Sequence, residues 1–206
     1  LEIASGMLEA PVEELVFASD HVEWPKEQKS VSLEDIGTKS MCGNGCALEV
    51  TESNTSPTSP PPFMAGAVEI ELDKETGHVE ILDYKAVVDC GTVVNPNLAR
   101  VQAEGGLVQG IGMTLYENIQ YNEKGRMLNN SFMQYKVPSR RDMGNLQVEF
   151  ESSYEDNGPF GAKSIGEVVI NTPTSAIASA IKHATGVQVR TLPITAEKVL
   201  LGKEDE

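Results

Sequence analysis

Residues 95–112 read NPNLARVQAEGGLVQGIG, and this stretch decides the fold that we expect for the chain. Asn95 is a suitable N-cap and Pro96 suits the first helical position, so a helix is predicted to begin here and to run through Leu115. Each glycine inside a helix costs about 1 kcal/mol relative to alanine, so a glycine-rich helix needs a structural reason. Close approach of the helix backbone to a ligand or to another backbone would supply it. The glycines in question are Gly105, Gly106, Gly110 and Gly112.

Two glutamines accompany these glycines. Gln102 and Gln109 are seven residues apart and therefore lie on one face of the predicted helix. Amide side chains both donate and accept hydrogen bonds, which suits a heterocyclic ligand with a mixed edge. The alternative is a glycine-rich helix that packs tightly against a sheet, and the residues alone leave both interpretations open.

A β-hairpin is predicted directly before this helix. Residues 67–72 alternate as a strand, residues 73–77 supply turn residues, and residues 78–89 resume β character. Cys90 is expected to end a buried strand. Beyond the helix, residues 118–152 indicate further short strands, with a turn at residues 122–125.

The C-terminal part of the chain is predicted to be helical. Asn171 or Thr172 is expected to cap a helix that has Pro173 at its start and Gly186 just past its end. Residues 193–200 indicate a last short helix.

The first sixty residues have a different composition. They contain 11 acidic and 3 basic residues, and residues 53–62 are rich in serine and proline, which is typical of an extended linker. We expect a helix over residues 1–10, strands at 15–17 and 30–33, and a short helix capped by Ser32 and Asp35. The chain is therefore divided into residues 1–60 and 61–206. Because strands and helices do not alternate regularly, the predicted fold class is α+β, with mixed short sheets and a few packed helices.

Charge and hydropathy exclude some partners. The chain has 31 acidic and 16 basic residues, a net charge of −15, which argues against nucleic acid and anionic membranes as partners. No apolar run approaches the roughly 20 residues of a membrane span, and no signal peptide is visible. We therefore expect a cytoplasmic protein. Because the chain starts without Met in an uncapped helix, we interpret it as a fragment of a longer protein.

Cysteines do not indicate a metal site. Cys42 and Cys46 have a spacing that zinc or iron–sulfur sites allow, but no second pair exists and Cys90 is remote. A glycine loop with two thiols is the simpler interpretation, and no protein metal ligands are predicted.

Residues 161–167 read GAKSIGE and directly precede the predicted helix at residue 171. A loop glutamate such as Glu167 can act as a general base where burial makes carboxylates more basic. The alternative is a solvated glutamate, or a first-turn charge that complements the helix dipole.

Taken together, these motifs resemble the molybdopterin-binding subunit of the xanthine dehydrogenase and aldehyde oxidoreductase family, and more specifically its C-terminal domain. The resemblance covers residues 65–200, and more loosely residues 1–60. The stretches that carry it are 68–77, 89–96, 102–112, 135–138, 163–167, 176–181 and 192–195.

The resemblance implies a cofactor and roles for particular residues. In that family the dithiolene of a pyranopterin, either molybdopterin or its cytosine dinucleotide form, holds molybdenum. The glutamate after a Lys-x-x-Gly pattern takes a proton from water or hydroxide at the metal, so that a purine, another N-heterocycle or an aldehyde becomes hydroxylated. Glu167 matches that catalytic base. The positions that match cofactor contacts are Gln102, Gly105, Gly106, Gln109, Lys163, Ser164 and Gly166.

The resemblance also implies partners. These are the upstream part of the same subunit, domains or subunits that carry FAD and [2Fe-2S] clusters, and an oligomeric assembly. One departure concerns Val168 and Val169, because the family usually has two prolines after its glutamate. A catalytically silent assembly subunit is the alternative function. The isolated chain is expected to bind no cofactor and to be inactive.

Overall fold

The computed structural model describes residues 1–42, 48–53 and 55–202. The chain forms two compact units, Leu1–Thr55 and Ser56–Glu206. Each unit has its own hydrophobic core. The predicted Cys42–Cys46 loop lies largely outside the described residues, and Cys42 itself is exposed.

The first unit is a small three-stranded antiparallel sheet with two helices. Its elements in chain order are α1 (Glu2–Leu8), η1 (Val12–Glu14), β1 (Val16–Phe17), β2 (His21–Trp24), β3 (Lys29–Ser32) and α2 (Leu33–Cys42). The predicted cap of α2 forms, because the Asp35 N–H donates to Ser32 Oγ at 3.0 Å.

Strand β2 was not predicted. Its four residues alternate between the core residue Val22, which is buried, and polar neighbours such as Glu23. So short an alternation gives almost no periodic signal. Its strand character comes from pairing with β1 and β3 on both sides.

The second unit is built on a three-stranded sheet. β4 (Phe63–Leu72) and β5 (Val79–Asp89) form the predicted antiparallel hairpin, and β6 (Asn145–Glu151) pairs parallel to β5. Side chains of β5 alternate between buried and exposed along most of the strand, so one face of the sheet is covered. The parallel register places Asp89 opposite Glu151, so the carboxyl ends of β5 and β6 lie together.

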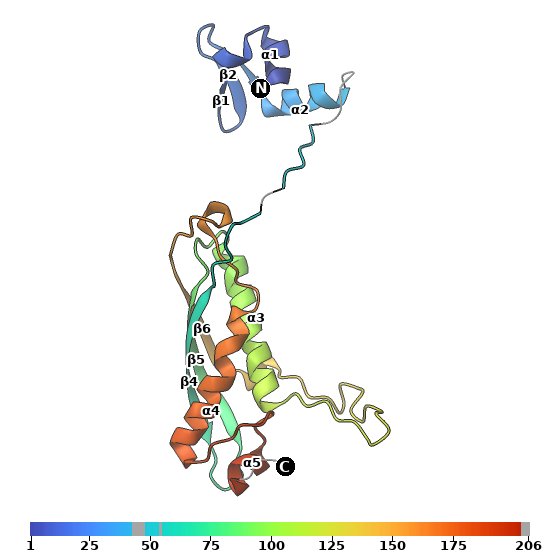
Figure 1. Cartoon of the computed structure of the whole chain (residues 1–206), viewed down its shortest axis with the longest axis vertical. Coiled ribbons are helices and arrows are strands. Elements are labelled where there is room, and N and C mark those ends of the chain that lie inside the picture. Colours follow the sequence, from blue (N-terminus) through green and yellow to red (C-terminus); the bar gives the residue numbers. More distant parts are fainter. Residues whose placement is uncertain (43–47, 54, 203–206) are drawn as a thin grey trace. The chain divides into compact units, whose positions relative to one another are not determined.

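Two long helices cover that face. α3 (Pro96–Leu115) and α4 (Asn171–Thr185) lie side by side along the sheet (Figure 1). Tyr84 of β5 donates to Thr172 Oγ1 at 2.9 Å and so connects the sheet to α4. Shorter helical elements complete the unit: η2 (Arg140–Asp142), η3 (Pro159–Gly161), η4 (Val168–Ile170) and α5 (Ala196–Leu201).

The helix ends agree with the sequence in part. Asn95 caps α3 and accepts from the N–H groups of residues 97 and 98, as predicted. Gly186 ends α4 in the left-handed conformation, also as predicted. The predicted cap of α4 was wrong: Asn171 is already helical, and the N-cap is Ile170, without a side-chain hydrogen bond. The 3-10 turn η4 leads directly into α4, so no side-chain cap is needed.

The segment between α3 and β6 has fewer strands than predicted. Within residues 116–144 the only strand-like pairing in the described chain is the bridge between Tyr121 and Met127, around the predicted turn. Figure 1 shows this segment extending away from the rest of its unit. Side chains such as Phe132 and Met133 are exposed there, so no core orders it as a sheet. The predicted α+β class, with small sheets and packed helices, is confirmed.

Candidate functional site

The glycines of α3 have two different environments. A Cβ atom added at Gly106 would lie 2.1 Å from Val169 Cγ2, and one at Gly110 would lie 2.7 Å from Pro173 Cγ. At Gly112 the added atom would meet Glu117 and Pro138. These three glycines therefore allow close packing within the chain, which was the alternative explanation offered by the sequence. Protein atoms fill the space beside these glycines, and the assignment of Gly106 as a cofactor contact stays a prediction.

Gly105 lies on the other side of α3. A Cβ atom there would have no neighbour within 4 Å. Gln102 and Gln109 are also exposed, so the predicted glutamine face exists and is open in the described part of the chain. Its apolar residues Leu98 and Val101 are exposed as well.

The 161–167 loop lies beside this open face. Gln102 Nε2 donates to the Gly166 carbonyl at 2.7 Å, although the two residues are 64 positions apart in the sequence. Glu167 follows immediately, and its backbone leads into η4. Ser164, Gly166 and Glu167 are exposed, so the loop presents a carboxylate, a hydroxyl and backbone groups on the surface.

Val169 follows Glu167 by two residues, at one of the two positions where the family resemblance leads us to expect proline. Its side chain is fully buried, in the space that Gly106 leaves free. Tight packing of one branched side chain thus fixes the course of the chain after Glu167, where prolines would fix φ angles.

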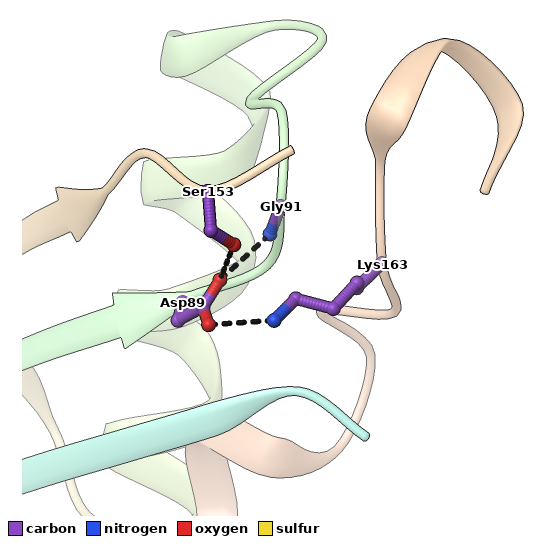
Figure 2. Close-up of polar contacts among 4 residues, drawn as sticks. All are labelled: Asp89, Gly91, Ser153 and Lys163. Carbon is purple, nitrogen blue, oxygen red and sulfur yellow. Dashed lines mark hydrogen bonds and ion pairs between the residues drawn. The ribbon is translucent and has the colours of Figure 1, made fainter. Parts of the chain in front are cut away.

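Lys163 anchors the other end of the loop. Its ammonium group pairs with Asp89 at 2.5 Å, and only 7% of its side chain is exposed (Figure 2). Asp89 also accepts from Ser153 Oγ at 2.6 Å and from the Gly91 N–H at 3.0 Å. The structure thus directs the Lys163 ammonium to a carboxylate of the same chain.

The electrostatics of this pair follow from its geometry. Hydrogen bonds from Lys163 and Ser153 lower the pKa of Asp89 to about 2, against the opposing effect of partial burial. Asp89 is therefore ionised at every pH at which a protein normally works.

A pocket of about 480 Å³ lies between α3 and the loop. It is lined by residues 90, 92–95, 98, 99, 102, 162, 163, 165 and 166. Gln102 and the loop residues thus border one concave surface. Cys90 also lines it, and burial raises the pKa of its thiol, which favours the neutral form.

No group of three or more His, Cys, Asp or Glu side chains in the described residues could hold a metal ion. A metal carried by the sulfur atoms of an organic cofactor needs no such group. At the pocket, Gln102 has an exposed amide side chain, and such a group can both donate and accept hydrogen bonds.

Comparison with known proteins identifies the family. The family model described as "Molybdopterin cofactor-binding domain" matches residues 1–144. The chain belongs to this family. The match includes the first unit and the second unit as far as residue 144, with the whole of α3.

Relatives agree with the assignment. The 6-hydroxypseudooxynicotine dehydrogenase complex subunit gamma of Paenarthrobacter nicotinovorans is 35% identical over 209 residues, which cover 96% of this chain and 26% of the relative. The xanthine dehydrogenase molybdenum-binding subunit of Escherichia coli O157:H7 is 32% identical over 202 residues, which cover 95% and 27%. This molybdopterin-binding domain therefore spans about a quarter of the length of these relatives.

A solved structure shares the fold. Quinoline 2-oxidoreductase from Pseudomonas putida 86 matches 97% of this chain and 27% of its own, with a TM-score of 0.80 and 25% identity. The family resemblance drawn from the sequence is confirmed, as is molybdopterin as the family's cofactor. None of the described helices is long and apolar enough to cross a membrane.

Sequence reasoning missed Asp89 and Ser153 as parts of the site. Asp89 was treated only as the end of a strand. The sequence carried no signal for this pairing, because the burial of Lys163 is visible only in the structure and nothing local says which of 31 acidic residues is its partner.

Proposed function

We propose that this domain forms part of the molybdenum-binding subunit of a hydroxylase, with Glu167 as its catalytic base. The observation that supports it is the hydrogen bond from Gln102 to the Gly166 carbonyl, which joins two family motifs at one pocket, and Glu167 is the residue after Gly166. The cofactor, when bound, would supply the metal at which water-derived oxygen is transferred to an electron-poor carbon. Glu167 would accept a proton at its carboxylate.

The residues that would hold the cofactor differ in how they act. Gln102, Gln109 and Ser164 have exposed polar side chains that can bind it directly, and Gly105 and Gly166 allow close approach of the backbone. Gly106 and Lys163 would act through packing and through the Asp89 ion pair instead.

The burial that catalysis requires would come from other parts of a larger subunit. Glu167 is exposed here, and a base works best in a site from which water is excluded. The chain spans 26% of one relative and 27% of another. The rest of such a subunit would cover Glu167 and exclude water from it.

For the substrate we propose an N-heterocycle, such as a purine, or an aldehyde. The named relatives carry 6-hydroxypseudooxynicotine, xanthine and quinoline in their names, and each of these compounds contains an N-heterocyclic ring. One relative is named as a subunit of a complex, which supports further subunits, and we propose that these carry FAD and [2Fe-2S] clusters. Free Cys42 and Cys90 suit a reducing, cytoplasmic compartment.

The test is Glu167→Gln in the complete subunit. The variant should retain its molybdenum and lose at least ~10²-fold in kcat, the usual scale for removal of a general base. Glu123→Gln, at an exposed glutamate in the segment after α3, is the matched control and should have normal turnover. Normal turnover of the Glu167 variant would contradict the assignment. A subunit without molybdenum would favour the silent assembly role.

A further inference from the structure

We infer that Asp89 is the positioning residue of the 161–167 loop and, through Lys163, sets the place of Glu167. This inference rests on the proposed role of Glu167. Asp89 belongs to β5 and does not line the pocket, so it acts through the loop and not on a ligand.

The Asp89 carboxylate joins three segments of the chain. One oxygen accepts from Ser153, after β6, and from the backbone of Gly91, after β5. The other oxygen accepts from Lys163 in the loop (Figure 2). A single carboxylate thus ties the ends of two parallel strands to the loop that carries Glu167.

Backbone contacts surround this ion pair. The Lys163 N–H donates to the Cys90 carbonyl at 2.7 Å, and the Thr92 N–H donates to the Gly161 carbonyl at 2.8 Å. A Cβ atom at Gly91 would lie 2.3 Å from the Gly161 carbonyl oxygen, so the two backbone segments, which form an isolated antiparallel bridge, are in direct contact. The start of the loop is therefore paired closely with the backbone that follows β5.

Because Lys163 is buried, the Lys163–Asp89 ion pair is needed to hold the start of the loop in place. With 7% of its side chain exposed, Lys163 has little access to water, and a buried ammonium without a carboxylate is strongly unfavourable. If Asp89 were neutral, Lys163 would have to move outward, and the loop backbone would move with it. Glu167 is four residues further along the same loop.

The far end of the loop has separate anchors. Gln102 binds the Gly166 carbonyl, and Val169 is buried against Gly106. Loss of Asp89 should therefore displace the loop without unfolding α4. A shift of about 1 Å in a catalytic group can cost ~10²-fold in rate, so even partial release of one end should be measurable.

The experiment compares Asp89→Asn, Lys163→Met and the double variant in the complete enzyme. Hydrogen exchange of the 161–167 peptide is measured together with kcat, molybdenum content and melting temperature. Residues 176–185 of α4 serve as an internal reference. Lys85→Met is the matched control, because Lys85 pairs with Asp83 on the same strand but has 64% of its side chain exposed.

We expect both single variants to exchange faster in the loop and to lose roughly 10-fold to 100-fold in kcat while retaining molybdenum. The double variant has no unpaired buried charge, so its melting temperature should return toward that of the parent. Its kcat should remain low and its loop exchange fast. Lys85→Met should change none of these readouts.

Three results would overturn the inference. Recovery of kcat together with melting temperature in the double variant would show a purely structural role. Loss of molybdenum in Lys163→Met but not in Asp89→Asn would show that Lys163 binds the cofactor directly. Unchanged exchange in the 161–167 peptide would show that Asp89 does not hold the loop. If Glu167→Gln is fully active, the base assignment fails, whereas loop exchange still tests Asp89.

Discussion

The two sides of α3 place neighbouring glycines in opposite settings. Gly106 packs against Val169 with no room for a side chain, whereas Gly105 has open space around it. One residue of rotation, about 100° around a helix, separates a packing position from an exposed one. A glycine-rich motif can therefore serve packing and binding at once, and each glycine has to be assigned separately.

The largest effect is expected for Gly106→Val. Its side chain would overlap Val169, so we expect a loss of about 3 kcal/mol in the free energy of unfolding. Thermal unfolding of the 206-residue chain, followed by circular dichroism, measures it. Gly105→Val is the matched control, one residue away, and should unfold close to the parent. Equal losses of unfolding free energy in the two variants would show that the two sides of α3 do not differ in packing.

Acid should loosen the loop beside the open side of α3. The pKa of Asp89 is lowered to about 2, so its ion pair contributes stability above the ordinary pKa of 3.8 and loses it as pH falls toward 2. This contribution is about 1–2 kcal/mol, allowing for partial solvent access. Urea unfolding between pH 5 and pH 2 should show a steeper loss for the parent than for Asp89→Asn. Parallel curves would mean that the pair contributes nothing to folding.

A double-mutant cycle sharpens the assignment of the packed side. Gly106→Ala should be destabilising, and less so in a Val169→Ala background, because the overlapping methyl group is then absent. We expect a coupling free energy of about 1 kcal/mol between the two sites. Additive effects, measured by urea unfolding of the four proteins, would show that the two residues do not share this space.

The smallest effect is expected for Gly105→Ala. Alanine is the better helix residue by about 0.5–1 kcal/mol, and nothing obstructs its methyl group, so the chain should become slightly more stable. In the complete subunit the same change should lower the molybdenum content, because we propose that this side approaches the cofactor. Full molybdenum content would move the cofactor contact away from Gly105.

Much of the fold could be predicted from local sequence. The Asn95 cap, the hairpin predicted over residues 67–89, the Ser32–Asp35 cap and the Gly186 helix end depend on residues close together in the chain. Their energetics are local, so the pattern predicts them. Strand β2 was not predicted, because its pairing with β1 and β3 determines it. The start of α4 was predicted wrongly, because the 3-10 turn η4 leads directly into it.

For the candidate site, too, the sequence predicted some features and the tertiary structure determined the others. The motifs around Gln102 and Glu167 were visible in the sequence and led to the family, although their contacts with the cofactor remain predictions. Only the tertiary structure decided which glycines pack inward, and that Val169 fills the space beside Gly106. It also decided that Lys163 pairs with Asp89, 74 residues away. Each of these depends on packing between distant segments, and burial, not spacing along the chain, determines the partner of a charge or the neighbour of a glycine.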